Sequence, residues 1–228
     1  MSGPLSGERG EPDEVRYGVF LRPDPRTCAA VTTIANQIRA QYGLVSAARF
    51  PPHATLAGSL PLAGAGDPHA ALQRLLATLD TLLDGAQPVA VVNAGIAWLG
   101  TGLVYDIHRL PSRPGGRPDR PNNALVALAA SVQGAVRPLL APDAPGRLAA
   151  DVHEPGAWRG HLSLASHELA ERADLREEVE DYARGLDVPV PARFSAELVS
   201  LYRFLHPSWR GPWWTDVRWS HVRSWRLR

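Results

Sequence analysis

The chain lacks lysine, and its 228 residues include one cysteine and one methionine. The single cysteine, Cys28, excludes an intramolecular disulfide and a cysteine-rich zinc site, and favours a reducing compartment. No apolar run approaches the roughly 20 residues that cross a bilayer, so we expect no membrane partner. A formal net charge of +1 provides no overall field that would favour long nucleic acids. These absences predict a soluble, cytoplasmic protein, and we expect it to be a monomer.

Several signatures of other enzyme classes are also missing. Gly64-Ala65-Gly66 is not followed by the lysine of a phosphate-binding loop, which argues against ATP-dependent ligation. No G-x-S-x-G elbow indicates a serine hydrolase. Six histidines lack the spacing of paired metal ligands, and His153-Glu154 and His167-Glu168 read as surface dipeptides; the six are His69, His108, His153, His167, His206 and His221. We therefore expect no metal and no cofactor.

The pattern of apolar residues predicts alternating strands and helices after a polar leader. Residues 1–14 are expected to be disordered. Residues 15–228 form one domain with lobes at about 15–110 and 122–228, with exchange of strands between the lobes left open. Strands are predicted at 15–21, 53–60, 89–98, 102–108, 160–165, 194–205 and 213–227, and helices at 27–42, 67–84, 122–136 and 169–184. The Pro/Gly/Arg-rich stretch 111–121 reads as a mobile loop, and 142–158 as a loosely packed segment.

One short motif occurs twice, once in each half. Residues 53–57 read His-Ala-Thr-Leu-Ala and residues 161–165 read His-Leu-Ser-Leu-Ala. Side chains at positions i and i+2 of a strand project from the same face. Each motif therefore presents an imidazole and a hydroxyl side by side, and turns its apolar residues toward a core.

The order of elements is similar in the two halves. Strand, helix, motif strand, helix and hairpin are followed by helix, motif strand, helix and hairpin, which is a weak internal repeat of topology. The predicted fold is α+β and bilobal. Two antiparallel sheets related by a pseudo-twofold axis would face each other across a central cleft, with helices on the outside.

The paired motifs resemble the signature of the 2H phosphoesterase superfamily, which includes bacterial 2′-5′ RNA ligase-like proteins and cyclic nucleotide phosphodiesterases. The resemblance rests on His53/Thr55 and His161/Ser163 and extends over about residues 15–228 in strand order; the closing strands around Tyr202 and Trp213-Trp214 are also similar. It implies metal-independent opening of a 2′,3′-cyclic phosphate, or chemistry at a 2′-5′ linkage, on an RNA end or a small nucleotide. It assigns His161 as the base and His53 as the acid.

Two positions depart from that family pattern. Ser166, five residues after the second histidine, stands where an arginine or aromatic residue often contacts the substrate, and Gly58 stands where the first motif often has a bulky residue. The resemblance places substrate contacts at Ser166 and Tyr202.

The four motif residues suit phosphodiester chemistry. Imidazole titrates near neutral pH, so one ring can act as base while the other acts as acid. The hydroxyls of Thr55 and Ser163 can donate to the phosphate oxygens on which charge develops. Two alternatives remain open: a module that binds an RNA end or a nucleotide without turnover, and an enzyme acting on a non-nucleotide cyclic phosphate.

The C-terminal segment offers a further surface. Odd-numbered residues from Trp213 to Trp225 share one face if the strand is regular, and six arginines occur after residue 200. Such a face suits base stacking and phosphate contacts. The alternative, that the tryptophans pack the sheet against helices, is the more common use of such residues.

Overall fold

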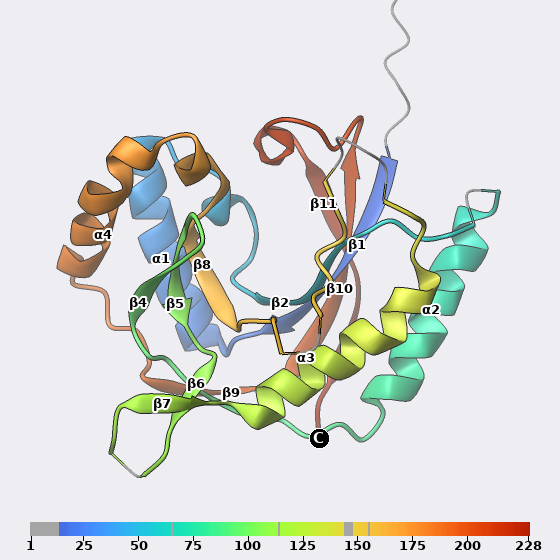
Figure 1. Cartoon of the computed structure of the whole chain (residues 1–228), viewed down its shortest axis with the longest axis horizontal. Coiled ribbons are helices and arrows are strands. Elements are labelled where there is room, and N and C mark those ends of the chain that lie inside the picture. The colour runs from blue at the N-terminus through green and yellow to red at the C-terminus, as the bar shows by residue number, and fades with distance from the viewer. Residues whose placement is uncertain (1–13, 65, 114, 144–147, 155) are drawn as a thin grey trace, which may run out of the picture.

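Strands from both ends of the chain form one four-stranded antiparallel sheet. The computed structural model describes residues 14–64, 66–113, 115–143, 148–154 and 156–228. The sheet consists of β1 (Glu14–Arg22), β2 (Ala54–Leu60), β10 (Leu198–His206) and β11 (Arg218–Arg226), in the order β11-β10-β1-β2. Figure 1 shows β1 and β10 side by side, and residue for residue Glu14 pairs with His206 and Arg22 with Leu198. The first and last strands of the described chain therefore build the same sheet.

The other strands form three smaller antiparallel sheets. Strands β4 (Ile96–Leu99), β5 (Gly102–Asp106) and β8 (His161–Ala165) pair in that order, β3 (Val89–Val92) pairs with β9 (Arg193–Ala196), and β6 (Arg109–Pro111) pairs with β7 (Pro118–Pro121). The α+β class and the antiparallel pairing are thus confirmed. The described residues form four sheets where two were expected. The predicted strands 89–98 and 194–205 are each divided, which gives β3 and β9 a sheet of their own, and β6 and β7 pair around the predicted loop 111–121.

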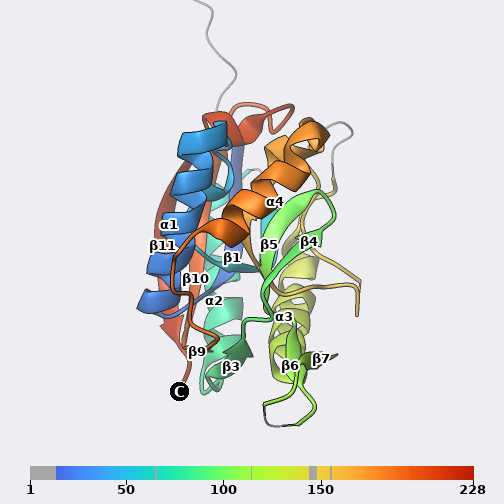
Figure 2. The ribbon, with the colours of Figure 1, turned by 90° about the vertical axis from the view of Figure 1, so that its left-hand side faces the viewer.

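Four helices cover these sheets: α1 (Pro25–Tyr42), α2 (Pro68–Leu83), α3 (Asn123–Val136) and α4 (Arg176–Gly185). Side-chain caps start three of them, since Asp24, Asp67 and Asn122 accept hydrogen bonds from backbone N–H groups of the first turns. Helices α1 and α4 lie next to each other on one side of the molecule (Figure 2). The opposite region is covered by α2 and α3, which pack together (Figure 1).

Helices and sheets are interleaved along the chain. Helix α1 follows β1 of the four-stranded sheet but packs against β8 of the three-stranded sheet. Helix α3 packs against β2, which comes from the first half of the chain. The two motif strands, β2 and β8, consequently belong to different sheets that are joined by packing across the sequence halves. The pseudo-twofold relation between the lobes, and their bounds, stay predictions.

Several predicted boundaries were wrong for local reasons. Helix α1 begins at Pro25 rather than Thr27, because Asp24 caps it and a proline suits the first helical position. The stretch 111–121 is partly ordered, since β6 and β7 pair and Ser112 donates its backbone N–H and its hydroxyl to Asp119. Helix α4 begins at Arg176, after two 3₁₀ turns at 167–170 and 173–175. Residues 1–13 of the predicted leader lie outside the described residues, whereas Glu14 belongs to β1.

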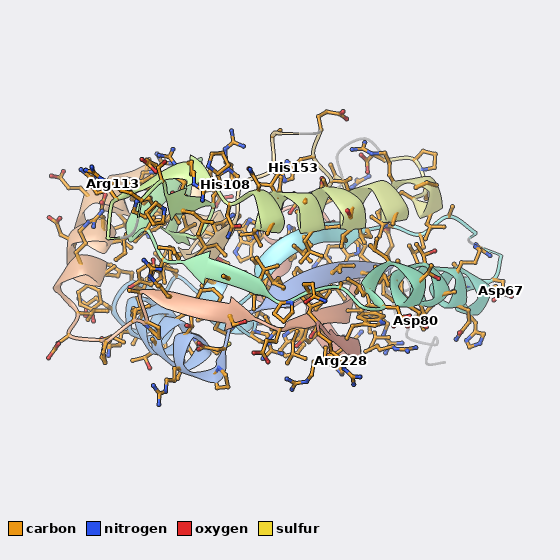
Figure 3. All side chains as sticks on the ribbon, turned by 90° about the horizontal axis from the view of Figure 1, so that it is seen from below. Asp67, Asp80, His108, Arg113, His153 and Arg228 are labelled. Carbon is orange, nitrogen blue, oxygen red and sulfur yellow. The ribbon has the colours of Figure 1, made fainter. Side chains whose placement is uncertain are left out.

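Strand β11 is shorter than predicted and does not keep one face. Residues 213–215 form a 3₁₀ turn, and a bulge opposite Leu201/Tyr202 reverses the alternation along β11. Trp219 consequently lies on the face that carries Tyr202, whereas Trp225 is 9% exposed and donates its indole N–H to Asp80 of α2, which Figure 3 labels. The packing interpretation therefore holds for Trp225.

None of the helices in the described ranges has both the length and the apolar character required to span a bilayer.

Candidate active site

The first motif begins at His53, directly before β2, and residues 53–56 follow the predicted alternation. Ala54 and Leu56 are buried on one face, at 1% and 0% exposure. His53 and Thr55 are half-buried on the other face. Pro51-Pro52 holds the backbone extended just before the strand, since the residue before a proline is driven away from helical conformations. The strand therefore presents the imidazole and the hydroxyl together.

The second motif on β8 repeats this arrangement. Leu162 and Leu164 are each 1% exposed, whereas His161 and Ser163 are half-buried. Strand β8 is paired on one edge with β5, where Asp106 lies opposite His161. The sequence thus predicted correctly which face each motif residue occupies.

The two motifs meet at one cavity of about 500 Å³. Its lining includes His53, Thr55, His161 and Ser163, two residues from each of two sheets. All four side chains that the sequence singled out for the chemistry are brought together there.

The two histidine rings are oriented by equivalent hydrogen bonds. His53 Nδ1 lies 2.7 Å from the carbonyl oxygen of Pro51, and His161 Nδ1 lies 2.9 Å from that of Arg159. A carbonyl oxygen only accepts, so in each ring Nδ1 carries the proton that it donates. Each neutral ring is thereby fixed in the tautomer with an unprotonated Nε2. Each carbonyl belongs to the residue two positions before its histidine, so the local geometry repeats as the motif does.

His53 has a strongly altered acidity. Burial lowers its pKa from 6.5 to about 4, and the hydrogen bond to Pro51 raises it only in part. The nearby positive charges of His161 and Arg22 lower it further. The ring of Phe20, whose centroid lies 4.3 Å from that of His53, contributes to this apolar setting. His53 is therefore neutral over the whole range around pH 7.

Two buried side chains connect the motif strands. Trp158, 5% exposed and just before β8, donates its indole N–H to the carbonyl oxygen of Thr55 at 2.8 Å. Gln133 of α3 donates to Leu56 O at 2.9 Å and accepts from His153 N at 3.0 Å. These bonds tie β2 to the segment that leads into β8, and so fix the separation of the two histidines.

Gly160, the residue before β8, leaves room for the Trp158 ring. A Cβ on Gly160 would come within 2.9 Å of both the Trp158 ring and Leu125. Only glycine therefore fits between the tryptophan and the second motif. His108, 8% exposed, accepts the Gly160 N–H at 3.4 Å, and burial lowers its pKa. This histidine has a structural position behind the second motif.

The cavity lining includes an arginine of β1 that the sequence analysis did not single out. Arg16, 2% exposed, donates to Ser59 Oγ at 2.8 Å and to the carbonyl oxygen of Leu148, and its guanidinium lies 5.2 Å from the ring centre of Trp209. Ser59 and Trp209 are the two non-glycine residues with positive φ in the described chain, at 50° and 52°. Strained backbone of this kind concentrates at functional sites. No pattern in the sequence indicates it, because it depends on tertiary contacts.

The two residues predicted to contact substrate have different positions. Ser166 lines the cavity, and its hydroxyl lies 2.9 Å from that of Ser46. Tyr202 is 6% exposed and outside the cavity lining; its hydroxyl accepts a hydrogen bond from Arg22 at 2.9 Å. Arg22 lowers the pKa of His53, so Tyr202 contacts a residue that influences the first motif but does not line the cavity.

The dipeptide His167-Glu168 is not a surface feature, contrary to the sequence-based interpretation. His167 lines the cavity and stacks on Trp214 with a centroid separation of 4.8 Å, and burial lowers its pKa. Glu168 accepts hydrogen bonds from the backbone N–H groups of Val45 and Ser46, each at 2.8 Å. The 3₁₀ turn after β8 makes this possible by turning both side chains inward.

Within the ranges that the structure describes, no three histidine, cysteine, aspartate or glutamate side chains are grouped as metal ligands would be.

Comparison with known proteins gives structural likenesses at low identity. No family model and no curated protein matches the chain. Escherichia coli LigT complexed with NADP⁺ is similar at 15% identity and a TM-score of 0.48, over 95% of this chain and 98% of that chain. A structure described as a phosphoesterase is similar at 15% identity and a TM-score of 0.48, over 95% and 99% of the two chains. Kluyveromyces marxianus Usb1 is similar at 13% identity and a TM-score of 0.40, over 92% and 98%.

At these identities and TM-scores the likeness assigns no activity to this chain.

Proposed function

We propose that this protein is a metal-independent phosphodiesterase of the 2H type that opens a 2′,3′-cyclic phosphate of a small nucleotide or an RNA end, or acts on a 2′-5′ linkage. The observation that carries the proposal is the convergence of His53, Thr55, His161 and Ser163 on one cavity. Both imidazoles are held there by their Nδ1–H groups. Acid, base and oxyanion donors are then all supplied by side chains.

We assign His53 as the general base. With a pKa of about 4, His53 is protonated in only about one molecule in a thousand at pH 7, so it is poorly suited to donate a proton in the free protein. Its neutral Nε2 can accept a proton from water as the water oxygen bonds to phosphorus. The bond from phosphorus to the 2′ or 3′ oxygen then breaks, and His161 gives its proton to that oxygen. This assignment is the reverse of the one that the family resemblance implies.

The hydroxyls of Thr55 and Ser163 would donate to the non-bridging phosphate oxygens. Each hydroxyl stands two residues after its histidine, on the same face of its strand. Charge on these oxygens grows as the fifth bond to phosphorus forms, so the donors bind the transition state more tightly than the ground state.

A panel of the four nucleoside 2′,3′-cyclic monophosphates tests this function. We expect turnover that survives EDTA, and a kcat/KM profile whose acidic limb reports the base, His53, near pH 4. Activity that is lost on chelation and restored by Zn²⁺ or Mn²⁺ would contradict the metal-independent scheme.

The same panel separates the alternatives. Saturable binding without turnover would indicate a module that binds a nucleotide or an RNA end. If neither binding nor turnover of nucleotides occurs, a non-nucleotide cyclic phosphate becomes the substrate to test.

A further inference from the structure

Resting on the proposed function, we propose that Asp151 makes the cavity selective for substrates whose reacting phosphodiester is their only negative charge. Its carboxylate accepts a hydrogen bond from an uncharged donor on the substrate. For a nucleoside 2′,3′-cyclic phosphate, this means a molecule with a free 5′-hydroxyl rather than a 5′-phosphate.

The position of Asp151 is fixed by the first motif strand. Its backbone exchanges two hydrogen bonds with Gly58 of β2, at 3.0 Å and 2.8 Å. A Cβ on Gly58 would come within 3.2 Å of Asp151 Oδ2 and 3.0 Å of Thr55 Cγ2. The absence of a side chain at residue 58 therefore admits a carboxylate into the cavity wall beside the Thr55 side chain.

One carboxylate oxygen of Asp151 is already engaged. Its Oδ1 lies 2.8 Å from His153 Nε2, and His153 is held beside α3 (Figure 3) by the bond from its N–H to Gln133. Among the described residues, none donates a hydrogen bond to Oδ2. The Asp151 side chain is 45% exposed, so Oδ2 is accessible to a ligand.

Arg16, the other charged side chain besides the histidines in the described lining, is engaged by protein groups. The Arg16 guanidinium forms an ion pair with Glu14 at 3.7 Å, and it donates to Ser59 and to Leu148 O. Arg16 and Asp151 are the arginine and acidic side chains among the described lining residues. A second phosphate within reach of Asp151 Oδ2 would be repelled by the Asp151 carboxylate.

The cavity wall also contains aromatic side chains, which suit an uncharged aromatic group. Trp209 and Trp213 line the cavity with their ring centroids 5.4 Å apart, and Phe204 lies nearby on β10. Aromatic faces stack on a nucleobase with little regard to its identity. Selectivity would then come from Asp151, because a carboxylate accepts from an O–H or N–H group and repels a second phosphate.

The test compares one cyclic nucleotide with and without a 5′-phosphate. We expect kcat/KM of the natural protein to be lower for the 5′-phosphorylated form by on the order of tenfold at low salt. In the Asp151→Asn variant, the kcat/KM values of the two forms should agree to within about threefold. High salt should reduce the difference in the natural protein, because the carboxylate is partly exposed. The Glu154→Gln variant is the control, since this substitution removes one negative charge from the same segment. Glu154 is 81% exposed and outside the cavity lining.

Two further arms make the outcomes distinct. If the donor is an exocyclic amino group of the base, kcat/KM for the cyclic phosphates of adenosine, guanosine and cytidine should exceed that for uridine, and Asp151→Asn should remove the difference. If the donor is the 5′-hydroxyl, kcat/KM should be alike for the four bases. Calorimetric binding of the two forms is measured alongside turnover, so that a preference in binding without any turnover defeats the proposed activity but supports Asp151. Equal kcat/KM for the two forms in the natural protein, or an unchanged ratio of the two kcat/KM values in Asp151→Asn, overturns the inference. Circular dichroism confirms that each variant is folded.

Discussion

The two motif strands have nearly the same sequence but place their histidines in different surroundings. Both rings are fixed through Nδ1 to the carbonyl two residues earlier, so their orientation is a local property of the motif. Only His53 is packed against a phenylalanine ring, and burial lowers its pKa to about 4. A repeated motif can therefore fix the geometry of two groups, while the tertiary environment sets the acidity of His53.

The largest expected effect comes from removing either ring. His53→Ala and His161→Ala should each lower kcat by about 10²–10⁴, because neither imidazole can serve as both acid and base within one cycle. His69→Ala is the matched control, since His69 is exposed on α2. Steady-state kinetics measures the loss of kcat. Retention of more than about a tenth of the activity in either motif variant would contradict the two-histidine mechanism.

The hydroxyls should matter less than the rings. Thr55→Val and Ser163→Ala should each lower kcat by about 10–10² with little change in KM, because the donated bond strengthens as charge develops on phosphate. Thr33→Val on α1 is the control, because the Thr33 hydroxyl bonds only within its own helix, to Ala29 O. Unchanged kcat in both motif variants would show that the hydroxyls do not reach the substrate.

The smallest effect concerns the link between the two strands. Trp158→Phe keeps most of the packing but removes the N–H that bonds Thr55 O, so we expect a loss of about 1–3 kcal/mol in the free energy of unfolding. A fall in kcat of about 3–10-fold should accompany it, because small displacements of catalytic groups are costly. Denaturant unfolding and kinetics are measured together.

Trp98→Phe is the control for that variant. Its indole N–H bonds Glu180, which lies outside the cavity lining, so its loss should affect stability and leave kcat unchanged. Equal kinetic effects of the two substitutions would show that Trp158 does not position the motifs.

The parts of the fold that follow from local rules could be predicted from the sequence. The more exposed and the buried faces of residues 53–56 and 161–164 follow from strand alternation, and the helix starts at Asp67 and Asn122 follow from capping. The convergence of the four motif side chains was also predicted, because two matched strands each had a polar pair facing away from their core.

The rest depends on contacts between distant segments. Arg16 reads as an ordinary strand residue until β1 is placed beside Ser59 and Leu148. Asp151 enters the cavity wall because Gly58 has no side chain, and β11 changes face because of a bulge that its composition does not reveal. Neither the strain at Trp209 nor the lowered pKa of His53 has a local sequence cause.

The most direct test of the difference between the two motifs is a titration of the histidine rings by NMR. With ¹⁵N-labelled histidine, and with His53→Ala and His161→Ala for assignment, the His53 ring should titrate with a midpoint near pH 4 and carry its proton on Nδ1 at pH 7. A midpoint for His53 at or above the ordinary value of about 6.5, or a proton on its Nε2 at pH 7, would contradict the assignment of His53 as the base.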